Sequence, residues 1–386
     1  MSVAAISLNP DLRRLQDEGY ELEVCDGYAL VHNVPYLDAS RKVQYGILVS
    51  PLTMRGDQVY YQKNACKHIM NFCGSMPYRN TGEPLKEILL DQNTCIVSGV
   101  TTNMRFSSKP HGDYNDYYEK FIGYIRILSA EAQAVDPNAT AATFRRIVPS
   151  EDGVFNYADT NASRADIVGF SDVFRQQKIG IIGLGGTGSY ILDQVAKTPV
   201  AEIHLYDGDV FCQHNAFRAP GAPPKELFTL QPMKVDYFKG IYSHMHHHII
   251  AHCYNLEEEN LLELQTLDFV FLAMDSGPSK RTIVDFLSKQ HISFVDTGID
   301  IQKTEKSLIG IVRSTRSTCG NLHAIEENVS FEPANKNLYA SNTQVADLNA
   351  IAALRAIIQW KQYSGFYSDS AESDNCIFST DIGEVS

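Results

Sequence analysis

The second half of the chain alternates short apolar runs with segments of helical periodicity. Residues 178–182 form an apolar run, a glycine-rich turn follows, and residues 190–197 have the spacing of a helix. Alternation of this kind predicts strands joined by helices, and hence a mostly parallel sheet. Further strands are predicted at 202–206, 249–253, 268–273, 292–296 and 308–312. With a helix at about 343–362, these elements form a predicted α/β domain over residues 165–366.

The first half of the chain mixes strand-like runs with turns and predicts a smaller α+β domain over residues 1–150. Its strand-like runs are 28–31, 43–49 and 94–97. Residues 121–128 have helical spacing and close this domain, and turn-rich residues within 149–163 mark the join. At the other end of the chain, residues 367–386 form an acidic tail that we expect to be mobile, except at 376–378.

Composition limits the class of protein. A length of 386 residues suits two domains, and 44% apolar with 20% charged residues is typical of a soluble globular chain. A net charge of −13 argues against nucleic acid or an anionic membrane as the main partner. We see no signal peptide, no apolar run long enough to span a bilayer, and no Cys-x-x-Cys pair. We therefore expect a cytoplasmic protein with reduced thiols.

A glycine-rich turn follows the first strand of the predicted α/β domain. Gly183, Gly185 and Gly188 form a Gly-x-Gly-x-x-Gly motif, with Gly186 beside them. Such glycines let main-chain N–H groups approach a phosphate at a helix N-terminus, where the peptide dipoles favour negative charge. Asp207 ends the next strand, where a carboxylate can accept both ribose hydroxyls. The motif therefore predicts a nucleotide site.

A set of polar residues follows Asp207 in order along the chain. These residues are Asp209, Asn215, Arg218, Lys234 and Asp275. The order resembles that of the ThiF-like and ubiquitin-activating-enzyme-like adenylation superfamily, which has a glycine loop, Asp-x-Asp, Asn-x-x-Arg, a Lys, and an Asp after the fourth strand. The resemblance covers about 165–365 and implies a Rossmann-like adenylation domain.

The resemblance implies that a carboxylate attacks the α-phosphate of ATP and that pyrophosphate leaves. Cations fixed in advance lower the energy of that transition state, because it spreads negative charge over the non-bridging oxygens. By the resemblance, Arg218 and Lys234 contact the phosphates, Asn215 orients them, Asp275 holds Mg²⁺, and Asp207 binds the ribose.

Two more residues are candidates by position. Homologous dimers insert an Arg from before the first strand into the partner's nucleotide site, and Arg164 has that place in a homodimer, with Arg175 as its rival. Activating enzymes often pass the acyl group to a cysteine, and Cys319 is the candidate acceptor because it follows the strand 308–312. Flanking arginines could lower the pKa of its thiol. A packing role for Cys319 and an oxyester route through nearby hydroxyls stay open.

Residues 105–110 and 112–118 resemble an uncharacterised bacterial domain that precedes ThiF-like domains beside ubiquitin-like genes. This resemblance implies a bacterial ubiquitin-like conjugation pathway tied to antiviral defence, with a ubiquitin-like protein as substrate and a conjugating-enzyme-like protein as partner. Tyr114, Tyr117 and Tyr118 are either contacts for that partner or core residues.

We therefore predict ATP-dependent adenylation of the C-terminal carboxylate of a ubiquitin-like protein. One alternative is an NAD-dependent Rossmann oxidoreductase, which shares the glycine motif but needs no Arg and Lys at this place. A second is a non-catalytic nucleotide-binding scaffold. The histidines within 244–252 are not expected to form a metal site, since adjacent histidines on a helix point in different directions.

Overall fold

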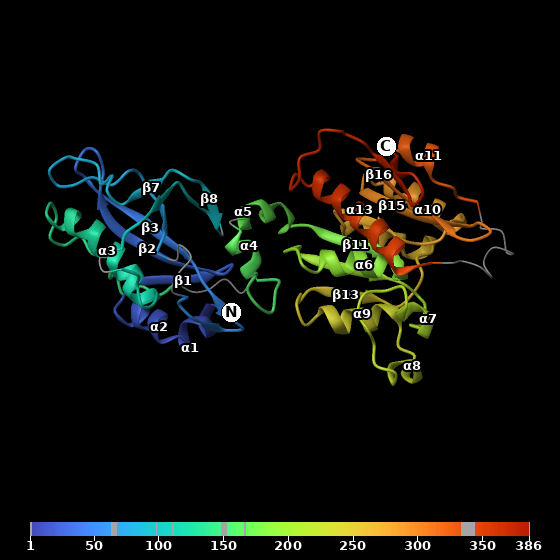
Figure 1. Cartoon of the computed structure of the whole chain (residues 1–386), viewed down its shortest axis with the longest axis horizontal. Helices are drawn as coiled ribbons and strands as arrows, with labels where there is room; N and C mark the ends of the chain where they lie inside the picture. Colours follow the sequence, from blue (N-terminus) through green and yellow to red (C-terminus); the bar gives the residue numbers. More distant parts are fainter. Residues whose placement is uncertain are drawn as a thin grey trace. The chain divides into compact units, whose positions relative to one another are not determined.

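The computed structural model describes residues 2–62, 68–97, 99–109, 112–147, 153–165, 167–332 and 344–385. The chain forms two compact units, Met1–Asp172 and Val173–Ser386, each with its own core (Figure 1). None of the helices in the described residues has the length and apolarity that a bilayer span requires.

The described residues of the first unit form a six-stranded antiparallel sheet in the order β1-β2-β3-β6-β10-β7. Its strands are β1 (Glu21–Cys25), β2 (Tyr28–Leu37), β3 (Val43–Pro51), β6 (Met70–Cys73), β7 (Leu89–Asp91) and β10 (Met104–Phe106). Two hairpins accompany it, β4 (Met54–Arg55) with β5 (Gln58–Val59) and β8 (Cys95–Val97) with β9 (Val100–Thr102). The helices are α1 (Ser2–Leu8), α2 (Pro10–Asp17), α3 (Tyr117–Gln133), α4 (Thr160–Arg164) and α5 (Val168–Ser171).

Asp116 caps helix α3, because its carboxylate accepts a hydrogen bond from the main-chain N–H of Glu119 at 2.7 Å. The predicted helix 121–128 is confirmed as the middle of α3. Tyr117, the first residue of this helix, is fully buried, and Tyr114, which precedes the helix, is nearly buried. Tyr118 donates to the Glu18 carboxylate. Burial of Tyr114 and Tyr117 favours the core role over the docking role.

The described residues of the second unit form an eight-stranded sheet in the order β13-β12-β11-β14-β15-β16-β17-β18. Neighbouring strands are parallel from β13 to β15 and antiparallel from β15 to β18. The strands are β11 (Lys178–Ile182), β12 (Glu202–Tyr206), β13 (Ile249–His252), β14 (Phe269–Leu272), β15 (Ser293–Lys303), β16 (Leu308–Ser317), β17 (Asn375–Ser379) and β18 (Gly383–Val385). The predicted Rossmann-like, mostly parallel α/β fold is confirmed.

Helices cover both faces of this sheet (Figure 1). One face packs against α6 (Gly186–Val195), α9 (Lys234–Tyr242) and α13 (Ala346–Tyr363). The other packs against α10 (Pro278–Lys289), α11 (His323–Asn328) and a 3₁₀ segment, Glu258–Thr266. The short helices α7 (Gln213–Ala216) and α8 (Leu227–Leu230) lie in the connection between β12 and α9. A three-layer arrangement of this kind buries both faces of a parallel sheet.

The end of the chain differs from the expected mobile tail. Strand β17 pairs with β16 along five residues, and β18 pairs with β17. The nearly buried guanidinium of Arg316 on β16 binds Asp369 at 3.0 Å and Asp374 at 2.9 Å. The exception expected at 376–378 lies within β17. Outside that exception, Asp369 and Asp374 neutralise the buried Arg316 cation, and this part of the stretch does not match the expectation of a mobile tail.

Candidate nucleotide site

The glycine turn folds so tightly that side chains are excluded from it. Gly183 has a φ of +87°, and a Cβ at this residue would lie 2.6 Å from the carbonyl oxygen of Ala273. A Cβ at Gly188 would lie 1.8 Å from the carbonyl oxygen of Gly183. A Cβ at Gly185 would instead meet nothing within 4 Å, so the space in front of it is open. The turn thus leaves room for a ligand at the N-terminus of α6.

Asp207 at the end of β12 fixes the turn. Its side chain is nearly buried and accepts hydrogen bonds from the main-chain N–H groups of Leu184 at 2.7 Å and Asp209 at 2.9 Å. Lys234, the first residue of α9, lies 3.3 Å from the Asp207 carboxylate and 2.6 Å from the exposed carboxylate of Asp209. The structure therefore brings the glycine turn, both acids of Asp-x-Asp and Lys234 into one connected group.

Asn215 and Arg218 each carry a buried N–H that has no hydrogen-bond partner among the described residues. The Asn215 side-chain oxygen accepts a hydrogen bond from the main-chain N–H of Cys212 at 2.8 Å. The Nδ2 of the same amide has no partner among the described residues. Burial lowers the pKa of the Arg218 guanidinium, and the negative charge of Asp275 partly offsets this. Buried donors left unpaired cost about 1–3 kcal/mol each, so this pair suits a site that binds an anion.

Asn349, on α13, is a site residue that the sequence did not reveal. Its fully buried side chain accepts from the Thr187 hydroxyl at 3.0 Å and donates to the main-chain oxygen of Arg218 at 3.4 Å. A Cβ at Gly186 would lie 2.2 Å from the same amide. Asn349 thus connects the start of α6 to the segment that carries Arg218. The only sequence signal was an amide within a predicted apolar helix.

A buried ion cluster lies beside the strand end that leads to Asp275. The fully buried Asp296 on β15 binds Lys280 at 2.7 Å and Arg313 at 2.6 Å. Its neighbour Thr297 donates to the main-chain oxygen of Leu272 at the end of β14. Sequence reasoning missed this cluster, because the three charges are far apart in the chain.

Asp275 is exposed in the connection between β14 and α10. The described residues contain no group of three or more His, Cys, Asp or Glu side chains that could hold a metal ion. Mg²⁺ in nucleotide sites commonly takes one or two carboxylates and completes its shell with phosphate oxygens and water. A single exposed carboxylate whose charge acts on the Arg218 guanidinium therefore fits Mg²⁺ that arrives with a nucleotide.

The structure does not bring Cys319 to this group. Ser317 at the end of β16 pairs with Phe294, near the start of β15, whereas the glycine turn and Asp207 follow the carboxyl ends of the parallel strands. Cys319 is exposed beyond that opposite edge, with its N–H bonded to the Ser293 hydroxyl. The main chain of Arg164 ends α4 in the first unit, and its side chain lies outside the described residues.

The profile of the ThiF family matches residues 162–373, which is more than half of the chain. The chain belongs to the ThiF family. A domain of unknown function (DUF6791) matches residues 10–160, ahead of the ThiF domain. No curated protein matches the chain.

Among solved structures, the ThiF chain is similar to MccB of E. coli with succinimide, at 16% identity and a TM-score of 0.42, covering 56% of this chain and 65% of that one. E. coli MccB with ATP has 16% identity and a TM-score of 0.43, with 58% and 67% covered. PaaA has 16% identity and a TM-score of 0.46, with 77% and 95% covered. The chain thus spans slightly less than two thirds of the first of these structures.

Proposed function

We propose that the ThiF domain binds ATP at the glycine turn and transfers its adenylyl group to a carboxylate of a protein substrate. The observation that carries this proposal is the pair of unpaired buried donors on Asn215 and Arg218, in a segment tied to the glycine turn through Asn349. A second cation, Lys234, is held next to the same turn by Asp207 and Asp209. Positive groups fixed in this way suit a triphosphate.

In the proposed reaction a carboxylate oxygen of the substrate bonds to the α-phosphorus, and the bond to the leaving pyrophosphate breaks. The products are an acyl adenylate and pyrophosphate. Arg218 and Lys234 stabilise the charge that develops on the phosphate oxygens, and the Asn215 amide donates to them. Asp207 accepts from the ribose, since a carboxylate oxygen can accept more than the one main-chain bond made here. Asp275 would hold Mg²⁺, which neutralises phosphate charge when bound.

We further propose that the substrate is the C-terminal carboxylate of a ubiquitin-like protein in a bacterial conjugation pathway with an antiviral role. The support is the resemblance of residues 105–110 and 112–118 to a domain found beside ubiquitin-like genes. In this proposal the first unit docks a conjugating-enzyme-like protein, the protein acts in the cytoplasm where ATP is present, and Arg164 enters the partner's site in a homodimer. In this proposal Cys319 does not accept the acyl group, because it lies at the opposite edge of the sheet from the glycine turn.

Exchange of radiolabelled pyrophosphate into ATP tests the adenylation step. With a small ubiquitin-like protein ending in glycine as substrate, we expect exchange by the wild-type chain and none by Asp275→Asn. The control Asp285→Asn removes an exposed carboxylate on α10 and should exchange normally. An oxidoreductase would bind NADH tightly and show no exchange. A scaffold would show no exchange, yet its binding of the ubiquitin-like protein would survive Asp275→Asn.

A further inference from the structure

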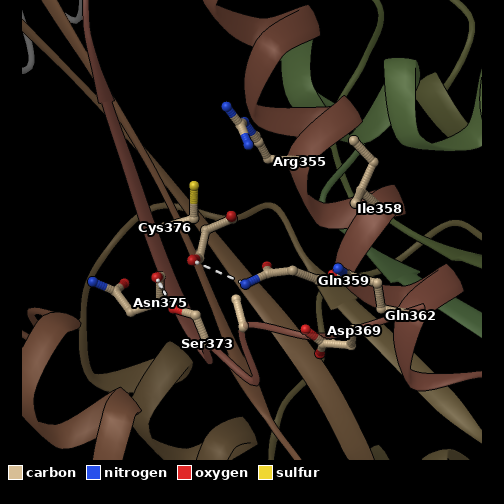
Figure 2. Close-up of a pocket in the computed structure, with 10 residues that line it drawn as sticks. Arg355, Ile358, Gln359, Gln362, Asp369, Ser373, Asn375 and Cys376 are labelled. Carbon is tan, nitrogen blue, oxygen red and sulfur yellow. Dashed lines mark hydrogen bonds between the residues drawn. The ribbon is translucent and has the colours of Figure 1, made fainter. Parts of the chain in front are cut away.

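A cavity of about 200 Å³ lies between helix α13 and strands β16 and β17 of the ThiF domain (Figure 2). Gln359 in its wall is ten residues further along α13 than Asn349, which is about 15 Å on a helix. The cavity is therefore separate from the nucleotide site. Its wall also contains Ser314, Arg355, Asp369, Asn375 and Cys376.

Two buried polar atoms of this wall have no hydrogen-bond partner among the described residues, the Ser314 hydroxyl and the Gln359 side-chain oxygen. The orientation of the Gln359 amide is fixed, because its Nε2 donates to the main-chain oxygens of Ser314 at 3.5 Å and Asp374 at 3.3 Å. Its Oε1 can only accept, so it needs an N–H or O–H donor. Unpaired buried acceptors are uncommon in native proteins and call for an occupant.

The cavity wall carries a positive and a negative side chain at different places. Figure 2 shows Arg355 on one side of Gln359 and Asp369 on the other. The guanidinium of Arg355 can only donate and attracts an anionic acceptor. The Asp369 carboxylate is bound by Arg316 at 3.0 Å and by the main-chain N–H of Glu372 at 3.1 Å, and it keeps further capacity to accept. An occupant that meets both sides is negative at one end and carries donors at the other.

The size of the cavity narrows the class of ligand further. About 200 Å³ would hold roughly six or seven water molecules, more than two unpaired atoms require. We propose that this cavity is a binding site for a free amino acid. Its carboxylate lies toward Arg355 and the Ser314 hydroxyl, and its ammonium group lies toward the Gln359 oxygen and Asp369. The C-terminal residue of a peptide presents a similar carboxylate with an N–H donor.

Ligand-induced thermal stabilisation of the full chain tests the proposal, with each standard amino acid and glycylglycine as separate probes. We expect at least one free amino acid to raise the melting temperature and to bind saturably by calorimetry. Its carboxamide derivative, which lacks the carboxylate, should not bind. Ser314→Ala and Arg355→Gln should each weaken binding by about tenfold or more, since each removes a hydrogen bond to a charged group.

Arg281→Gln is the matched control, because it removes an exposed arginine on α10, outside the cavity wall, and should leave binding unchanged. Binding of glycylglycine in preference to every free amino acid, with the same losses in Ser314→Ala and Arg355→Gln, would place a peptide C-terminus in the cavity and overturn the assignment to free amino acids. The proposal is also overturned if no probe binds saturably, or if binding survives both cavity variants in protein that melts like the wild type.

Discussion

At the scale of single residues, the nucleotide site depends on donors that the protein itself leaves unsatisfied. Arg218 shows this most clearly, since it is half-buried, its Nε has no partner among the described residues, and burial lowers the pKa of its guanidinium. The nearby charge of Asp275 only partly compensates. A cation held in this way is costly in the free protein and is stabilised when a polyphosphate binds.

Replacing Arg218 with Gln should therefore lower pyrophosphate exchange by about 10²–10³-fold, the usual effect of removing one group that stabilises a developing anion. The folded protein should lose little stability, because the variant removes a poorly compensated buried charge. Exchange rates at saturating ATP and thermal melting measure the two effects. Arg281→Gln is the control. Wild-type exchange by Arg218→Gln would remove Arg218 from the site.

His246 makes a prediction about pH. It is fully buried, its Nε2 donates to the main-chain oxygen of Val200, and its Nδ1 accepts from the main-chain N–H of His248. Burial lowers the pKa of His246 to about 4, whereas an unfolded histidine titrates near 6.5. Between pH 4 and 6.5, His246 is therefore protonated in the unfolded chain and neutral in the folded chain. Stability is therefore fully present above pH 6.5 and falls as the pH drops toward 4, by up to about 1.4 kcal/mol per pH unit.

Urea denaturation at several pH values measures this dependence. His246→Gln should show a shallower loss of the free energy of unfolding between pH 6.5 and 4 than the wild type. The exposed His247→Gln should keep the wild-type slope. Equal slopes for the wild type and His246→Gln would show that His246 is not the residue that titrates.

At the scale of elements, the junction of β11 and α6 decides whether the nucleotide site can form. Main chain packs there so closely that a Cβ at Gly183 would overlap the carbonyl oxygen of Ala273, and a Cβ at Gly188 that of Gly183. Asn349 of α13 closes the third side, against Gly186 and Thr187. The glycine turn is thus enclosed by main chain after β14 and by the Asn349 side chain of α13, and main-chain contacts limit its tolerance of substitution.

Gly188→Ala should abolish ATP binding and destabilise the ThiF domain by about 1–3 kcal/mol, because its Cβ would overlap the carbonyl oxygen of Gly183. Gly240→Ala is the matched control, since this exposed glycine lies inside α9 and a Cβ there would meet nothing within 4 Å. It should raise stability by about 0.5–1 kcal/mol and leave ATP binding intact. Calorimetry and denaturant melts separate the two variants. Wild-type affinity in Gly188→Ala would contradict the role given to the turn.

At the scale of the whole molecule, the last residues of the chain complete the sheet of the second unit. Arg316 is nearly buried on β16, and its charge is met by Asp369 and Asp374. Strand β17 covers the edge of β16 along five residues. The acidic stretch is therefore part of the α/β domain.

Ending the chain after residue 366 should destabilise the second unit by about 3–5 kcal/mol or more, because it leaves Arg316 without either carboxylate and uncovers an edge strand. Ending it after Ser379 keeps β17 and both acids, and should cost much less. Thermal melting of the two truncated chains provides the comparison. Equal stability of the two would show that the pairing of β17 is dispensable.

The sequence by itself determined the order of the strands from β11 to β16 and the residues of the glycine turn. Apolar runs and glycine spacing are local signals, and the strands 178–182 and 202–206 coincide with β11 and β12. The resemblance to the ThiF family, which the family match confirms, was carried by motif residues in order along the chain from Gly183 to Asp275. Local spacing predicts these features because neighbours in sequence stay neighbours in the fold.

Only the tertiary structure decided the contacts between distant segments. Asn349 lies far along the chain from Thr187, the charges that meet at Asp296 come from three elements, and Asp369 and Asp374 return to Arg316. Sheet register likewise separates Cys319 from the glycine turn, although both follow strands of the same sheet. Such relations depend on strand order and direction, which are set by packing of the whole chain rather than by any one segment.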